Sequence, residues 1–516
     1  MSEMGSARVR VRNEVRSGLW LALAGLGLGI EFIFAYLTLR NPLPELYTTI
    51  IHDGQQTTPF FYSVSSNMVL LSRPEFVVVT VALALLFAAA LGVALRRAYT
   101  VEGDDSALAA VILGSAVVFS LTLLWMYPLF SQDVFDYIFQ TREWVFHHSN
   151  PFIHVPNDFA ADPFLKYIAW VQMPSTYGPL WMIITAPLAL LGGNSLLANL
   201  FYFKGLEVVA YLATTLLIYS TLGKVQPRWQ LAGTLLFAWN PLILMEFAGS
   251  GHNDILMLFM VALACWLLVN QRFTLAMLAL TAGALIKVVA GFVLPLFIIY
   301  ALIQPQMKGK RLSFLLRTGT LCLGSALLIY APLWDGPDSL AFLKLGDKLG
   351  GPIPTAIVYM LDAAHVSRAD AISWVKNVAW VAFALFYARQ CWALWCGNHA
   401  SAADWRVTRW AAQRAESLLA RFAVGRRLLH RIELAELSAA QPESQFAQLA
   451  RANGMVLLFF LGAVSLYYQP WYLSWSLFWL VFLVAPRYKL HSWPLLALSC
   501  IVVIANVFAG ITGWGT

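Results

Sequence analysis

The chain has 516 residues, of which 59% are hydrophobic and only 12% carry a charge. Soluble domains carry roughly 25% charged residues, so this composition excludes a soluble globular protein. The net charge of +7 arises from basic residues beside apolar runs. That placement suits contact with anionic lipid headgroups and argues against a nucleic-acid partner.

Long apolar runs follow one another along almost the whole chain. A helix needs about 20 apolar residues to cross a bilayer, and most of the runs approach or reach that length. They lie near residues 18–38, 75–95, 107–128, 179–192, 196–222, 229–248, 254–270, 273–286, 288–304, 313–333, 373–396, 453–470, 472–486 and 491–511. We therefore expect an all-α, multi-pass transmembrane bundle of about 12 to 14 helices in the cell membrane.

Basic residues predict which loops face the cytoplasm, because lysine and arginine resist translocation. The arginine-rich N-terminus and the pair Arg96 and Arg97 belong to that side. The acid-rich loops 129–178 and 334–372 then lie outside. Loops of this length within a compact bundle usually fold over a site or carry function.

The run at 179–192 has a length that complicates this orientation. At 1.5 Å per residue it reaches roughly 21 Å, less than the bilayer core of about 30 Å. If it does not cross, Lys224 falls on the cytoplasmic side and the turn 249–254 lies outside. We favour that arrangement.

Three regions are expected along the chain: a transmembrane catalytic region at 1–396, a cytoplasmic basic segment at 397–451 and C-terminal transmembrane helices at 452–516. The middle segment alternates apolar and basic residues at helical spacing. It is either an amphipathic helix on the inner membrane surface or a solvated linker helix.

A first polar cluster follows the apolar run that ends at Leu129. Ser131 is expected as the N-cap of a short interfacial helix, with Asp133 in its first turn, where the helix dipole favours a carboxylate. Asp133, Asp136 and Gln140 share one face at spacings i, i+3 and i+7. The apolar residues Phe135, Ile138 and Phe139 are expected on the membrane side. Two carboxylates on one face suit a general base, a divalent cation or a cation-transport site, although capping and solvation would also explain them.

Further polar residues lie at the ends of later apolar runs. Asn150 and Tyr177 are expected to fix the mouth of a site, and Pro179 starts the next helix because its φ is already helical. Lys287 is the single charged residue of an apolar stretch, so its ammonium group must pair with an anion or extend to the membrane interface. Placed at the outer end of a helical hairpin, it could bind a phosphate.

The segment from Trp239 to Asp254 forms another cluster, which includes Glu246. Gly249 and Gly251 permit a sharp turn, after which Asn253 and Asp254 open the next helix. His252 lies within this turn between two apolar spans. A structural histidine and a functional one both fit that position.

These motifs resemble the bacterial GT-C superfamily of integral membrane glycosyltransferases. The likeness is strongest to the polyprenyl-phosphate-mannose-dependent α-mannosyltransferases of actinobacterial lipoglycan synthesis. It covers most of residues 107–305, with a weaker match at residues 467–471. The matching segments are SQDVFDYIFQTREW, NPF, YGPLW, WNPLILMEFAGSGHND and AGALIKVVAGFVLPL.

The resemblance implies a GT-C-like fold and a sugar donor linked to a polyprenyl phosphate, with mannose favoured. The acceptor would be a hydroxyl of a glycolipid or lipoglycan at the outer membrane face. Asp133 matches the family's acidic residue and becomes the expected base of an inverting transfer, whereas Asp136 stands where a small polar residue is expected.

The residues expected at the site fall into three groups by role. The catalytic group is Asp133, Asp136, His252 and Asp254, and the group for the donor phosphate is Lys287, Arg142 and Lys204. The substrate-binding group is Gln140, Tyr137, Asn150, Tyr177, Asn253, Tyr468, Gln469 and Trp471.

No cofactor is certain from the sequence. A divalent metal (Mg or Mn) remains possible because Asp133, Asp136 and His252 could converge, although no spacing demands it. The absence of a P-loop or Rossmann motif agrees with a donor activated by a lipid carrier. A transporter or lipid flippase is the main alternative function, but no internal repeat is visible. A non-catalytic scaffold is the third.

Overall fold

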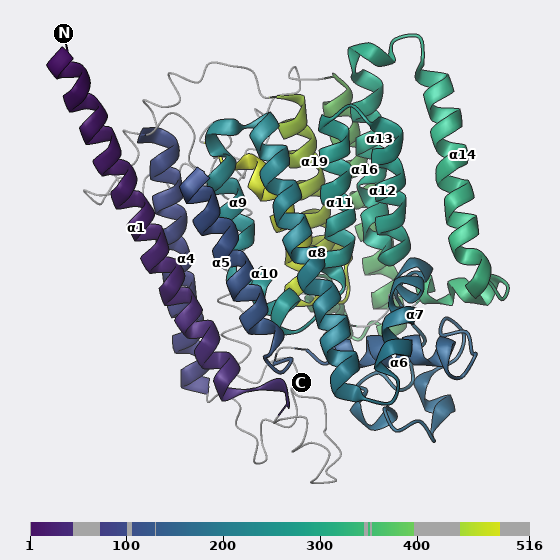
Figure 1. Ribbon diagram of the computed structural model, residues 1–516. Helices are drawn as coiled ribbons and strands as arrows, with labels where there is room; N and C mark the ends of the chain where they lie inside the picture. Colours follow the sequence, from purple (N-terminus) through teal and green to yellow (C-terminus); the bar gives the residue numbers. More distant parts are fainter. Residues whose placement is uncertain are drawn as a thin grey trace. The chain divides into compact units, whose positions relative to one another are not determined.

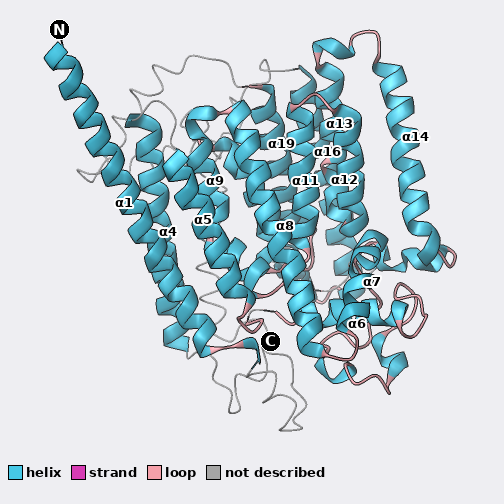
Figure 2. Cartoon of the chain, in the orientation of Figure 1, coloured by secondary structure: helices cyan, strands magenta, loops and turns pink. Residues whose placement is uncertain are grey.

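The computed structural model describes residues 2–44, 73–100, 106–129, 131–344, 349–350, 353–396 and 444–485. Within these ranges the chain is helical and has no strand, only two isolated bridges, Pro42 with Met126 and Gly350 with Tyr467. Figure 1 shows the helices, and Figure 2 shows the loops that join them. The expected all-α fold is confirmed.

Seven described helices are long and apolar enough to span a membrane, or eight if a bent pair counts as one span. The pair is Pro227–Ala238 with Pro241–Gly249. Six further apolar helices have only 10–17 residues. The expected architecture of many membrane helices therefore holds, but fewer of the described helices reach spanning length than the apolar runs suggested. The run 491–511 and most of the segment 397–451 lie outside the described residues, and residues 445–451 begin α19.

The described chain divides into two compact units. The first comprises the described parts of Met1–Gly291 and Thr318–Leu345, and the second those of Phe292–Arg317 and Gly346–Asn506. The helices of the first unit are α1 Ser2–Arg40, α4 Arg73–Thr100, α5 Ser106–Leu124, α6 Asp133–Val145, α7 Pro179–Gly192, α8 Leu196–Val225, α9 Gln230–Ala238, α10 Pro241–Ile243, η4 Leu244–Gly249, α11 Asp254–Val269 and α12 Phe273–Ile286. Those of the second are α13 Leu294–Ile303, α15 Ile353–Ala363, α16 Arg368–Cys396, α19 Gln445–Phe459 and α20 Leu473–Leu480, and α14 Arg311–Tyr330 has residues in both.

The core of the first unit is built around α8 and α11, which pack together, with α12 against α11 and α5 against α8. The run expected as one helix at 229–248 is instead broken. It bends by 45° between Ala238 and Pro241, because proline has no amide hydrogen to continue the helix. Asn240 Oδ1 caps the new start by accepting from Leu242 N–H at 3.0 Å. The chain then forms the π-helix η4.

The helix α7 begins and ends beside α6. At its start, the ring of Tyr177 lies edge-on to Tyr137 of α6 at 4.8 Å between centroids. At its end, Arg142 of α6 donates to Gly193 O at 2.8 Å. Both ends of this 14-residue helix are thus on the same side of the unit as α6.

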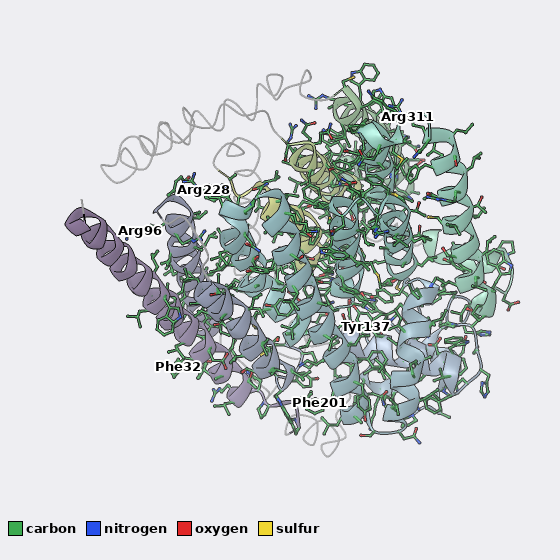
Figure 3. All side chains as sticks on the ribbon, turned by 45° about the horizontal axis from the view of Figure 1, so that its top comes forward. Phe32, Arg96, Tyr137, Phe201, Arg228 and Arg311 are labelled. Carbon is green, nitrogen blue, oxygen red and sulfur yellow. The ribbon has the colours of Figure 1, made fainter. Side chains whose placement is uncertain are left out.

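The 30-residue helix α8 then runs to the other end of the unit, a length of about 45 Å. Arg228, just after α8, donates through Nε to Ala98 O beside Arg96 and Arg97, at 2.6 Å. Figure 3 shows Arg96 and Arg228 close together and away from Tyr137. Arg96 and Arg228 therefore lie at the same end of the first unit, and the cytoplasmic orientation expected for the basic residues stays a prediction.

A close backbone approach fixes α7 against α12. Gly178 N–H donates to Ile286 O at 2.9 Å, and a Cβ at Gly178 would lie only 2.0 Å from Leu285 O. Glycine is therefore required here for space.

Replacing Gly178 by alanine should destabilise the protein by about 1–3 kcal/mol, as overpacking does. Thermal unfolding in detergent, followed by tryptophan fluorescence, measures the loss. Gly205→Ala is the control, since nothing lies within 4 Å of a Cβ there and alanine favours a helix interior. Equal unfolding temperatures for the two variants would contradict the steric argument.

Candidate active site

Asp133 begins α6, and its amide donates to Ser131 Oγ at 3.1 Å. The helix therefore starts as expected, although the N-cap residue is Gln132 rather than Ser131. The side chain of Asp133 is 19% exposed, whereas the rest of the site is nearly closed. A carboxylate in the first turn is stabilised by the positive end of the helix.

The apolar face of α6 was wrongly expected to face the membrane. Phe135, Ile138 and Phe139 are all buried, because α6 packs against α7 and α8 and is covered by the loop that follows it. That loop folds back, with Ser175 N–H donating to Pro151 O at 2.7 Å. The helix is consequently enclosed on both faces.

His252 lies in the turn that follows η4. Gly251 has φ +79°, a conformation that glycine adopts without strain, and this turn points the imidazole of His252 toward α6. Its Nδ1 is 3.7 Å from Asp133 Oδ2 and 3.4 Å from the hydroxyl of Tyr137. The His252 side chain is fully buried, so the sequence motif after Glu246 meets the motif at Asp133 in space.

Glu246 is also part of this cluster, although the sequence analysis assigned it no role. Its Oε2 lies 3.3 Å from His252 Nε2, and its carbonyl oxygen accepts from His252 N–H at 3.1 Å. The π-helix places Glu246 in this position. Helical spacing at 3.6 residues per turn does not predict such a register, and an acidic residue within an apolar run was the only available signal.

Lys287 closes the other side of the cluster. It follows α12 directly, and its Nζ donates to both carboxylate oxygens of Asp254 at 2.8 Å. Asp254 is the first residue of α11, as expected. The ammonium group also lies 5.7 Å from the centre of the Tyr177 ring, which links the ion pair to α7.

Asp136 and Gln140 lie on the same face of α6 as Asp133, but both are buried. Asp136 Oδ1 accepts from Trp170 N–H at 3.1 Å, so this carboxyl group holds the loop. Burial, together with the negative charge of Asp133, raises the pKa of Asp136 well above its usual value. The pKa of the buried Tyr137 is likewise raised by burial and by nearby Tyr177, Asp133 and Asp254, so Tyr137 stays a neutral donor.

Arg142 and Lys204 have partners that account for their positions. Arg142 Nη2 donates to Asp162 Oδ2 at 3.0 Å, and both side chains are buried. Lys204 Nζ donates to the carbonyl oxygens of Leu123 and Leu124 at 3.1 and 3.0 Å, and to that of Met126. Lys204 thus caps the C-terminal end of α5, where a cation matches the helix dipole.

The expected substrate-binding residues are divided between the two units. Asn253 is fully buried beside the cluster, and Asn150 Nδ2 donates to Leu333 O at 2.9 Å, which anchors the loop. Tyr468, Gln469 and Trp471 belong to the second unit. Their expected role in binding substrate stays a prediction.

No group of three or more His, Cys, Asp or Glu residues in the described ranges has the geometry to hold a metal ion. The carboxylate of Glu207, which the sequence did not single out, lies near Asp254 and raises the number of acids around the ion pair. Both its oxygens lack a hydrogen-bond partner among the described residues.

Known proteins share sequence similarity with this chain. Residues 54–303 match the family described as alpha-(1->6)-mannopyranosyltransferase, N-terminal domain. Over 253 residues the chain is 23% identical to alpha-(1->6)-mannopyranosyltransferase A of Mycobacterium tuberculosis, which covers 46% of this chain and 47% of that protein. The chain therefore matches about half the length of this curated relative. No solved structure matches.

The fold and the matched region thus define a polytopic membrane protein similar to GT-C glycosyltransferases. More narrowly, the similarity is to the alpha-(1->6)-mannopyranosyltransferases, and the matched residues 54–303 contain the cluster from Asp133 to Lys287. The resemblance drawn from the sequence motifs is confirmed.

A buried acid on α6 makes the stability of the protein depend on pH. Burial, with added repulsion from Asp158, Asp136 and Asp162, raises the pKa of Glu143 from 4.5 to about 9. Folding therefore favours the protonated form. The stabilisation is fully present below about pH 4.5 and is lost as the pH rises through about 9.

Glu143→Gln should remove this dependence, because the amide stays neutral at every pH. Unfolding temperatures measured from pH 5 to 10 should decline more steeply for the wild type than for the variant. Parallel curves would show that Glu143 is not neutral in the folded protein.

Proposed function

We propose that the protein transfers mannose from a polyprenyl-phosphate donor to a hydroxyl of a glycolipid or lipoglycan at the extracytoplasmic face of the membrane. The observation that carries the proposal is a partly exposed carboxylate, Asp133, at the edge of a buried cluster that contains the cation Lys287. The similarity of residues 54–303 to mannosyltransferases supports the choice of sugar.

Asp133 is proposed as the general base. A sugar hydroxyl has a pKa far above 7, so a carboxylate must take its proton as the oxygen attacks, a contribution of typically 10²–10⁴-fold in rate. Asp133 is more exposed than Asp136 and can meet an acceptor. Attack opposite the phosphate inverts the anomeric centre.

Lys287 is proposed to neutralise the leaving group. The bond between the anomeric carbon and the phosphate oxygen breaks, and the phosphate departs as a stable anion that needs positive charge more than a proton. Lys287 is paired with Asp254 in this structure, so a bound phosphate would share the ammonium group with that carboxylate. Arg142 and Lys204 are engaged in loop and helix contacts and are the weaker choices.

The orientation is proposed from charge. Arg96, Arg97 and Arg228 gather at the end of the first unit opposite α6. Because basic residues favour the cytoplasm, this distribution supports a location of the Asp133 cluster on the outer side. A lipid-linked donor is available to such a site without a cytosolic nucleotide sugar.

Asp133→Asn should abolish transfer from radiolabelled polyprenyl-phosphate mannose to membrane acceptors, a loss of about 10² or more. Folding and donor binding should persist, because the amide keeps the shape of the side chain. Wild type and variant are compared in the same membranes. If wild-type protein transfers no sugar from any lipid-linked donor, even with added divalent metal, a transporter becomes the better interpretation.

Lys287→Ala should weaken donor binding rather than lower the maximal rate alone. Since it also leaves Asp254 buried without its cation, which costs stability, the double variant Lys287→Met with Asp254→Asn is needed as well. A folded double variant that still has a raised KM for the donor supports phosphate binding. Recovery of a normal KM in the double variant would assign Lys287 a structural role only.

A further inference from the structure

Trp170 lies in the loop that covers α6 and differs from several other aromatic residues of that loop. Phe152, Phe164 and Tyr167 are buried, whereas Trp170 is 38% exposed. A partly exposed indole presents a flat apolar face with a polar N–H group at its edge. The reaction steps proposed above assign this side chain no role.

The backbone of Trp170 is held on both sides. Its N–H group donates to Asp136 Oδ1 at 3.1 Å, and its carbonyl oxygen accepts from Met173 N–H at 3.1 Å. The next residue along the chain is held as well, because Val171 O accepts from Asn157 N–H at 2.9 Å. The indole therefore extends from a stretch of loop that is already ordered, so a ligand that binds there need not order the loop first.

Asp136 connects Trp170 to the proposed base. Asp136 and Asp133 are one turn apart on α6, which places their Cβ atoms about 5–6 Å from each other. Asp136 is buried beneath the loop, whereas the side chain of Asp133 is 19% exposed. A carboxylate that accepts a proton and an accessible aromatic ring thus belong to neighbouring parts of one site.

A carbohydrate fits this pair of groups. The C–H groups on one face of a pyranose ring are apolar and pack on an indole, while the hydroxyl groups around the ring form hydrogen bonds with N–H groups and carboxylates. An anionic ligand is disfavoured at this place, since Asp133 carries a charge of the same sign. The acceptor of the proposed reaction, a sugar hydroxyl, has the required chemistry.

We propose that Trp170 is an acceptor-binding residue, on which a sugar ring of the glycolipid or lipoglycan stacks while its hydroxyl group meets Asp133. Asp136 is the positioning residue that holds Trp170 through the loop backbone. The inference rests on the proposed function and names its acceptor subsite. No bond is made or broken at either residue.

The role given to Asp136 requires a hydrogen-bond acceptor but no negative charge. Burial raises the pKa of Asp136, and a protonated carboxyl group still has a carbonyl oxygen that accepts from Trp170 N–H. An amide at this position would keep the same contact. Asp136 and Asp133 therefore respond differently to substitution by asparagine.

Transfer kinetics with the glycolipid fraction extracted from the membranes test the role of Trp170. Trp170→Leu should raise the KM for this acceptor fraction about 3- to 10-fold, the value of an aromatic contact, with little change in the KM for the donor. Trp170→Phe keeps an aromatic face and should recover part of the loss.

Trp334→Leu is the matched control. Trp334 is 51% exposed in another loop of the same unit and has no part in the site, so both KM values should stay as in the wild type. A tryptophan at a membrane interface often serves only as an anchor. An unchanged acceptor KM in Trp170→Leu, or an equal rise in Trp170→Leu and Trp334→Leu, would overturn the proposal.

Two substitutions of Asp136 test its positioning role. Asp136→Ala removes the acceptor of the Trp170 hydrogen bond and should raise the acceptor KM as Trp170→Leu does. Asp136→Asn keeps an oxygen at this place and should restore the acceptor KM, whereas Asp133→Asn abolishes transfer. If Asp136→Asn lowers kcat as much as Asp133→Asn, Asp136 takes part in the chemistry and the positioning role is wrong.

A binding measurement separates this inference from the proposed function. Water-soluble glycan released from the glycolipid fraction is added to the purified protein, and NMR saturation passing from the protein to the sugar C–H protons is recorded. The signal should be at least about threefold weaker for Trp170→Leu than for the wild type and Trp334→Leu. No signal with the wild type, or equal signals for all three, refutes the inference even if the enzyme transfers sugar. The expected signals from a protein that transfers no sugar from any lipid-linked donor would refute the proposed function alone.

Discussion

The ion pair between Lys287 and Asp254 is the contact on which the site depends. It joins the end of α12 to the start of α11 with two donor distances of 2.8 Å, in surroundings where an unpaired charge would be strongly destabilising. Because Asp254 follows the turn that carries His252, fixing α11 also fixes the imidazole. The close approach of Gly178 to Leu285 brings α7, and with it Tyr177, to the same place. Separate segments of the chain are thereby held around Asp133.

The helical fold could be predicted from apolar runs, since the bilayer requires long apolar helices whatever their partners. The sequence contains an Asn-Pro pair at the break before Pro241, but hydrophobicity alone does not indicate that the helix is broken there. Helices of 14 residues, such as α7 and α12, are equally apolar whether or not they cross the bilayer, so their composition does not decide between the two. The covered faces of Phe135 and Phe139 were missed because the loop that encloses α6 acts through contacts distant in sequence.

For the site, the sequence could identify Asp133, His252, Asp254 and Lys287, because each is a charged or titratable group in apolar surroundings that demand an explanation. The same signal could not separate Lys204 from Lys287. Lys204 reaches backbone carbonyl oxygens about 80 positions away, and a carbonyl group has no signature in the sequence. Glu246 depends on the register of a π-helix, which helical periodicity does not reveal.

The position of α7 keeps two distant motifs at one end of the first unit. Because both ends of α7 lie beside α6, the chain starts α8 from the end of the unit at which α6 lies. If α7 ran the length of the unit instead, the later turns would lie at the opposite end, and His252 would be separated from Asp133 by the length of a helix such as α8. A short helix that turns back is therefore what allows two motifs more than 100 residues apart in the chain to meet.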